Sequence, residues 1–147
     1  MNLELFNVKD YMIHKPPMLL VDKVLEESAA EAKTSFKIKD DCIFLDENNI
    51  LAKSVLIEVA AQSFAVADIY QRTRDGRVLA KGFLVSVRDF KFYGDAKLGD
   101  EIICDIKKTN ELAGVHIIEA KVFAGTFSIA EGELRIFELP QEITAQS

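Results

Sequence analysis

Residues 55–67, VLIEVAAQSFAVA, form the most informative stretch of the sequence. Their composition predicts a helix in which only Glu58, Gln62 and Ser63 are polar. A helix that is apolar all round is buried all round. In a chain of 147 residues, a curved sheet wrapped around the helix is the arrangement that achieves such burial. We therefore expect one buried central helix.

The flanking sequence predicts the elements that surround this helix. The helix should run from about 50 to 74 and end before Gly76. Residues 3–13 predict a short helix that stops at His14, because Pro16 disfavours the helical conformation just before it. Residues 18–29 and 31–38 predict an antiparallel hairpin. Four further strands are expected at residues 78–93, 100–110, 114–125 and 126–139.

This order of elements predicts an α+β fold with one curved antiparallel sheet around a long central helix, known as the hot-dog architecture. The length fits a single domain over residues 1–147. The polar residues from about Pro140 onward predict a loose tail.

Composition and charge argue against several classes of function. A net charge of −6 and a pI near 5.0 give no basic footprint for nucleic acid. No secretory signal and no apolar run of membrane-spanning length are apparent, so we expect a cytoplasmic protein without a membrane span. The histidines and cysteines are too scattered for a metal site, and the isolated cysteines are expected to be buried, reduced thiols.

Glu58 is the leading candidate for chemistry. A carboxylate in an apolar interior is costly unless it is paired, hydrated or chemically used, although a purely structural partner would also explain it. Gln62 lies four residues further on, on the same side of the helix, and could contact substrate or satisfy a strand end. Gly82 lies inside a predicted strand, where close approach of a ligand or a bulge would explain it. With Phe83 it is a candidate for substrate binding.

Three stretches together resemble the FabZ-type β-hydroxyacyl-ACP dehydratases. They are HKPPMLLVDKVLE (14–26), VLIEVAAQSFA (55–65) and KGFLVSVRDFKFYGDAKLGDEI (81–102). The chain is most similar to the aryl-polyene branch of that family, the ApeP-like dehydratases. The resemblance implies a hot-dog dimer with active sites at the subunit interface, acting on acyl thioesters in fatty acid or polyene synthesis. The substrate would arrive on the phosphopantetheine arm of acyl carrier protein, and no cofactor would be needed.

The resemblance also implies an acid–base pair. In the family, a histidine on the loop before the central helix acts on the α-proton, and a helix carboxylate handles the departing hydroxyl. Glu58 matches that carboxylate, but the position of the loop histidine falls on Phe44. His14 then becomes a candidate base, although it could simply brace its turn. His116, in a late strand, is expected to be solvent-facing or at the rim of the core.

Arg88 and Lys91 resemble the basic positions that meet acyl carrier protein, or they guard a solvated strand edge. The first functional hypothesis is a dehydratase in which Glu58 is the acid and His14 or a partner subunit supplies the base. The alternatives are a hot-dog thioesterase in which Glu58 activates water, and a non-catalytic acyl-carrier-binding subunit. The chain could form a homodimer or a heterodimer with another hot-dog subunit.

Overall fold

A computed structural model describes residues 2–140, so the tail predicted to be loose lies almost wholly outside the described residues. The elements are a 3-10 turn η1 (Leu3–Leu5), α1 (Val8–Tyr11), β1 (Lys23–Glu27), β2 (Glu31–Lys37), α2 (Ser54–Arg74), β3 (Ala80–Phe92), β4 (Glu101–Leu112), β5 (Val115–Ala124) and β6 (Phe127–Pro140).

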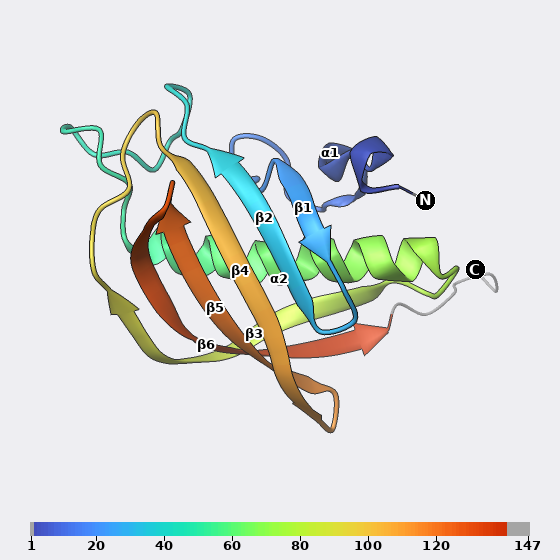
Figure 1. Cartoon of the computed structure of the whole chain (residues 1–147). Helices are drawn as coiled ribbons and strands as arrows, with labels where there is room; N and C mark the ends of the chain where they lie inside the picture. Colours follow the sequence, from blue (N-terminus) through green and yellow to red (C-terminus); the bar gives the residue numbers. More distant parts are fainter. Residues whose placement is uncertain (1, 141–147) are drawn as a thin grey trace.

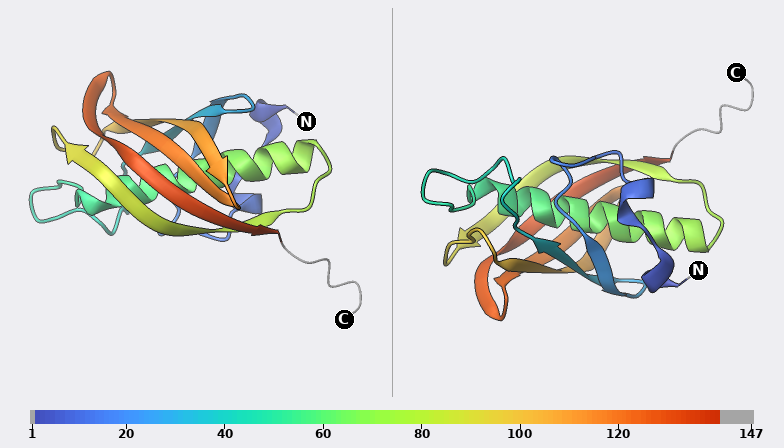
Figure 2. Two further views of the ribbon diagram at one scale, coloured as in Figure 1. Left: turned by 90° about the horizontal axis from the view of Figure 1, so that it is seen from below. Right: turned by 90° about the horizontal axis from the view of Figure 1, so that it is seen from above.

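The strands form one antiparallel sheet of six strands in the order β1-β2-β4-β5-β6-β3. The sheet curves around α2, which lies along its concave face (Figure 1). Figure 2 shows the same wrapping from below and from above. The predicted hot-dog fold is confirmed.

Alternation along the strands builds the core between sheet and helix. On β4, Ile102, Cys104 and Ile106 are buried, whereas the residues between them are half-buried or exposed. A period of two in burial is what a sheet covered on one face produces. Burial raises the pKa of the Cys104 thiol to about 12, so this cysteine is an inert part of the core. Cys42, expected to be buried, is only half-buried, and both cysteines are free.

The central helix differs from the prediction in two respects. It begins at Ser54 rather than near Ile50, because a bridge between Leu45 and Leu51 keeps the preceding loop extended. It is also not buried on every side, since Glu58 is exposed and Ala61 is only half-buried. The sheet covers one side of α2, and the N-terminal segment covers only part of the other.

That N-terminal segment forms a second, smaller core against the later half of α2. Phe6, Val8 and Met12 are buried there with Val66 and Tyr70 of the helix. The single helix expected over residues 3–13 is instead η1 and α1, separated at residues 6–7, and the Asn7 side chain caps α1 by accepting a hydrogen bond from the Lys9 amide. Figure 2 shows this segment running alongside α2.

Strand β3 is one edge of the sheet and is unusual in its exposure. Along its length no residue is fully buried, and four large apolar side chains in its first half are exposed. These side chains belong to Phe83, Leu84, Val85 and Val87. A long apolar edge strand is the kind of surface that pairs with another chain.

Candidate functional site

Glu58 and His14 meet on the side of α2 that the sheet leaves open. His14 Nε2 lies 3.8 Å from Glu58 Oε1, and the two side chains are 37% and 47% exposed. The sequence singled out the two residues separately, Glu58 as the leading candidate for chemistry and His14 as a candidate base, but the expected burial of Glu58 was wrong for this chain. A carboxyl and an imidazole that both face open space can exchange protons with a molecule bound there.

Gln62 ties the helix to the segment that follows His14. Its side-chain oxygen accepts a hydrogen bond from the Leu20 amide at 2.7 Å, and its nitrogen donates to the Met18 carbonyl at 3.1 Å. The same nitrogen donates to Glu58 Oε1 at 3.2 Å. The buried amide thus holds the Glu58 carboxylate and the His14 segment in a fixed relation.

The backbone on either side of His14 is anchored. Met12 is buried in the smaller core, and the Met18 and Leu19 amides both donate to the Lys15 carbonyl, closing a turn around the cis peptide bond between Pro16 and Pro17. Among the residues that the structure describes, the buried His14 Nδ1 has no hydrogen-bond partner. The ring is therefore positioned by its backbone, and its free Nε2 side faces Glu58.

Two cavities meet at this pair. The larger, of about 510 Å³, lies between α2, the N-terminal segment, β3 and β6, and Glu58 and His14 both line it. The wall that α2 forms carries little side-chain volume between Glu58 and Asp68, because Ala61 and Ala65 contribute only methyl groups. The larger cavity is mainly apolar in lining, as expected for a site that takes a hydrocarbon chain.

The smaller cavity, of about 400 Å³, opens on the other side of the pair. It is lined by His14, Glu58 and Gln62 together with Phe44 of the loop before the helix. Phe44 is the position at which the family resemblance requires a histidine. The structure therefore places a phenyl ring beside the pair where the relatives are expected to place their base.

The other predicted site residues divide into two groups. Gly82 and Phe83 line the larger cavity on β3, and a Cβ atom at Gly82 would come within 3.2 Å of the Ile136 side chain. Arg88 and Lys91 lie further along β3, exposed and outside both cavities, on either side of a bulge at Asp89. The structure thus brings the substrate-binding candidates to the pair and leaves the two cations on the strand edge.

A second polar cluster lies at the far end of the larger cavity, where Asp68 and Glu138 line it. Glu138 Oε1 is 2.5 Å from His116 Nε2 and 3.5 Å from an Arg72 nitrogen. Arg72 also binds Asp68 at 2.9 Å. His116 was expected at a rim or in solvent, but it is buried, because its side chain points to the concave face of the curved sheet.

The environment of this cluster changes its protonation. Burial, and next a hydrogen bond with Asp68, raise the pKa of Glu138 to about 8. Burial lowers the pKa of His116. Burial therefore favours the uncharged forms of Glu138 and His116, beside the ion pair of Asp68 and Arg72. Nothing in the sequence analysis singled out this cluster, although Asp68 follows Glu58, Ala61 and Ala65 on one side of the helix.

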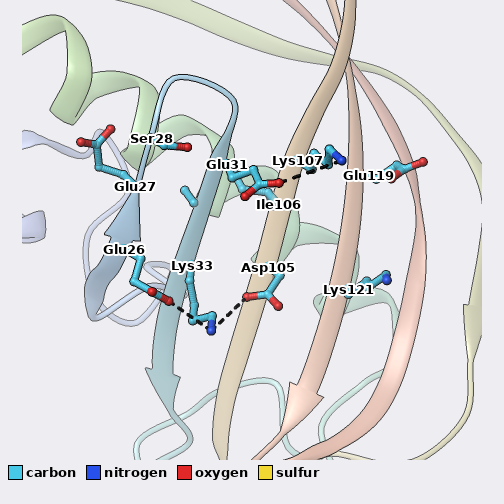
Figure 3. A pocket seen from close by; sticks show the side chains of 11 residues that line it. Glu26, Glu27, Ser28, Glu31, Lys33, Asp105, Ile106, Lys107, Glu119 and Lys121 are labelled. Carbon is cyan, nitrogen blue, oxygen red and sulfur yellow. Dashed lines mark ion pairs between the residues drawn. The ribbon is translucent and has the colours of Figure 1, made fainter.

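A depression on the outer face of the sheet is a weaker candidate (Figure 3). Its walls carry alternating acids and bases that pair with each other, as Lys33 does with Glu26 at 3.1 Å and with Asp105 at 4.0 Å. Such mutually paired, exposed charges are typical of a solvated sheet face.

Within residues 2–140, no cluster of side chains suitable for holding a metal ion is present. No helix among these residues is long and apolar enough to cross a membrane.

Comparison with known proteins identifies the family of the chain. A family model described as ApeP-like, ApeP dehydratase, matches residues 6–146. The chain belongs to the ApeP-like dehydratase family. It is also 23% identical over 142 residues to the 3-hydroxyacyl-[acyl-carrier-protein] dehydratase FabZ of Streptococcus sanguinis, covering 89% of this chain and 99% of the relative.

Solved structures share the fold of this ApeP-like chain. The dehydratase heterocomplex ApeI:P from Xenorhabdus doucetiae matches with a TM-score of 0.84 at 18% identity, covering 96% of this chain and 95% of the other. A hypothetical thioesterase from Streptococcus pneumoniae, solved with coenzyme A, matches with a TM-score of 0.65 at 9% identity, covering 82% and 90%. Family membership makes the chain a hydroxyacyl-ACP dehydratase-like protein, and the more remote thioesterase match concerns the fold alone.

Proposed function

We propose that this chain dehydrates 3-hydroxyacyl thioesters held on acyl carrier protein, with Glu58 and His14 as the acid–base pair. The observation that carries the proposal is the 3.8 Å approach of His14 Nε2 and Glu58 Oε1 at the junction of two cavities. The FabZ relatives are named for this reaction. The sequence left the base open between His14 and a partner subunit, and the proposal assigns it to His14.

The pair can manage both protons of the elimination. Neutral His14 Nε2 takes a proton from the carbon next to the thioester carbonyl. Glu58, in its acid form, gives a proton to the hydroxyl on the next carbon, which leaves as water while the carbon–carbon double bond forms. The imidazolium that remains then returns its proton to the carboxylate, so the pair is restored after each turnover.

The cavities suit the two halves of such a substrate. The larger cavity, with the alanines of α2 and the apolar wall from Gly82 and Phe83, is suited to the acyl chain. The smaller cavity leads from the pair past Phe44 and is suited to the thioester and the phosphopantetheine arm. No further cofactor is needed for the elimination, because no electrons are exchanged with a carrier.

Gln62 acts as a positioning residue in this scheme. Its hydrogen bonds are made to the backbone of Met18 and Leu20 and to Glu58, so it holds the acid and the base-bearing segment together. Although it lines the larger cavity, both hydrogens of its nitrogen are already donated within the protein.

Strand β3 supports a dimeric assembly. Its exposed apolar side chains and unpaired edge are suited to pairing with a second hot-dog subunit. The ApeI:P structure, which is similar in fold to this chain, is a heterocomplex. We propose a partner of that kind, with a second copy of this chain as the alternative, and Arg88 and Lys91 as contacts for the acidic carrier protein.

The decisive experiment is mass-spectrometric turnover of a panel of 3-hydroxyacyl carrier proteins by the wild type and by Glu58→Ala, with hydrolysis followed in the same samples. Loss of water that depends on Glu58 supports the proposal. Release of free acid instead would establish a thioesterase. A panel left unchanged by the chain, alone and with a hot-dog partner, would refute catalysis and favour the acyl-carrier-binding subunit.

A further inference from the structure

The side chains that α2 presents to the two cavities follow one order along the helix. Ser54 lines the smaller cavity, and Glu58 lines both cavities. Ala61 and Ala65 line the larger cavity. Successive members of this series are three or four residues apart, so they stand on one side of the helix. A substrate that passes from the smaller cavity into the larger one therefore meets Ser54 before Glu58.

Most side chains in the smaller cavity cannot give a hydrogen bond to a bound thioester. Gln62 already donates both hydrogens of its nitrogen within the protein, to the Met18 carbonyl and to Glu58. His14 and Glu58 are engaged with the two protons of the elimination. Four other lining side chains are apolar, namely Met18, Leu20, Phe44 and Val55. Among the described side chains that line this cavity, the remaining donor is Ser54.

The Ser54 hydroxyl is free to engage a bound molecule. Ser54 is the first residue of α2 and is exposed. Within residues 2–140, no hydrogen bond to another residue engages its side chain. A serine hydroxyl can rotate its hydrogen towards whichever acceptor is present. A carbonyl oxygen that enters the smaller cavity can therefore receive a hydrogen bond here without breaking one made within the protein.

The proposed elimination needs such a donor. Removal of a proton from the carbon next to a thioester carbonyl shifts negative charge onto the carbonyl oxygen, and a donor already placed at that oxygen stabilises the transition state. In the substrate, one carbon separates the carbonyl carbon from the carbon that bears the hydroxyl. Ser54 and Glu58 are one helix turn apart, with about 5–6 Å between their Cβ atoms. Each can reach one of the two substrate oxygens.

We propose that the Ser54 hydroxyl donates a hydrogen bond to the thioester carbonyl oxygen and stabilises the charge that develops when His14 takes the α-proton. The electron pair of the broken carbon–hydrogen bond moves onto the carbonyl oxygen. It returns to form the carbon–carbon double bond as the hydroxyl leaves as water with the proton of Glu58. The inference rests on the proposed function, because it takes the thioester to lie in the smaller cavity.

Steady-state kinetics of Ser54→Ala with a 3-hydroxyacyl carrier protein test this role. We expect kcat to fall about a hundredfold, the effect of losing one donor to a developing oxyanion, while KM changes less than about threefold. Ser54→Thr, which keeps the hydroxyl, should retain most of the turnover. Ser128→Ala, at an exposed position of β6 outside both cavities, is the matched control and should change neither constant. An unchanged kcat in Ser54→Ala would overturn the proposal.

Hydrogen exchange isolates the step that Ser54 should assist. The probe is dodecanoyl pantetheine in D2O, which has α-hydrogens but no hydroxyl to lose, and mass spectrometry follows the uptake of deuterium. The wild type and Glu58→Gln should exchange the α-hydrogen, whereas Ser54→Ala should do so about a hundredfold more slowly at an unchanged Tm. A merely structural serine would not slow exchange in a fully folded protein. Equal exchange in the wild type and Ser54→Ala, including none in either, would overturn the proposal.

The two measurements also separate this proposal from the proposed reaction. A wild type that dehydrates its substrate, with Ser54→Ala equally active, refutes the role of Ser54 alone. Exchange that depends on Ser54, in a chain that never dehydrates, refutes the reaction alone. A chain that does neither refutes both.

Discussion

A carboxyl group lines the larger cavity at each end, Glu58 at one and Glu138 at the other, and each has an imidazole beside it in opposite surroundings. At one end, Glu58 and His14 are 3.8 Å apart and more than a third exposed. At the other, Glu138 and His116 are 2.5 Å apart and almost wholly buried. The same two side chains are thus free to act on a bound molecule in the first setting and locked into the protein in the second. Packing, rather than residue type, separates a reactive pair from a structural one.

The largest expected effect tests the exposed pair. Glu58→Gln should lower turnover of a 3-hydroxyacyl carrier protein at least about a hundredfold, because a general acid is removed, while Tm changes little at this exposed position. Steady-state kinetics and thermal unfolding of the same sample measure both. Glu47→Gln, in an exposed loop, is the control and should change neither. Turnover unchanged in Glu58→Gln would remove Glu58 from the reaction.

The next prediction concerns stability at the buried cluster of Asp68, Arg72, Glu138 and His116. Arg72→Met removes the cation shared by Asp68 and Glu138 and should lower the free energy of unfolding by about 3 kcal/mol, because the Asp68 charge is left uncompensated. Chemical denaturation measures this loss. Arg77→Met is the control, since Arg77 pairs with Asp75 in solvent and its loss should have little effect. Equal effects of the two changes would contradict the contrast between the ends.

Gln62 is buried although its partner Glu58 is exposed, so its substitution should affect both stability and turnover. Gln62→Leu leaves the Leu20 amide and the Met18 carbonyl without the bonds that Gln62 supplies, and should lower the free energy of unfolding by about 2 kcal/mol. Because the His14 segment is also released, turnover should fall as well. A variant that is destabilised but turns over normally would limit Gln62 to a structural role.

The smallest effect concerns pH. The pKa of Glu138 is raised on folding, so its contribution to stability is present below its unfolded value of about 4.5 and is lost as pH rises through about 8. His116, whose pKa is lowered, works in the opposite direction only below about 6.5. Between pH 7 and 8.5 the wild type should therefore lose about 1 kcal/mol relative to Glu138→Gln. Parallel plots of the free energy of unfolding against pH for the two proteins would contradict the buried setting of Glu138.

Local patterns in the sequence predicted most of the fold. The apolar character of residues 55–67 and the alternation in the later strands led to a sheet wrapped around α2, because both patterns report burial directly. The start of the helix was missed, since the bridge between Leu45 and Leu51 is a tertiary contact without a local signal. The close approach of Phe90 to Gly132 was also not predictable from the sequence. It is so close that a Cβ atom at Gly132 would lie 2.6 Å from the Phe90 Cα.

The site was predictable only in part. Glu58 and Gln62 were found because polar residues in an apolar helix are conspicuous. His14 could be proposed as a base only from the family resemblance, because its meeting with Glu58 depends on how the N-terminal segment folds back. The buried cluster was missed, since Glu138 and His116 lie on the paired strands β6 and β5 but come together with Asp68 and Arg72 of α2 only when the sheet wraps around the helix.

Two alanines on α2, Ala61 and Ala65, keep the larger cavity wide along the helix. Ala61 and Ala65 stand about 5 Å and about 10 Å beyond Glu58 along the helix axis, each with a single methyl group facing the passage. A leucine at either position would act as a stop at that depth. The position of one bulky side chain along the helix would therefore set the depth of the cavity. In the proposed reaction, this depth would limit the length of the acyl chain that the protein accepts.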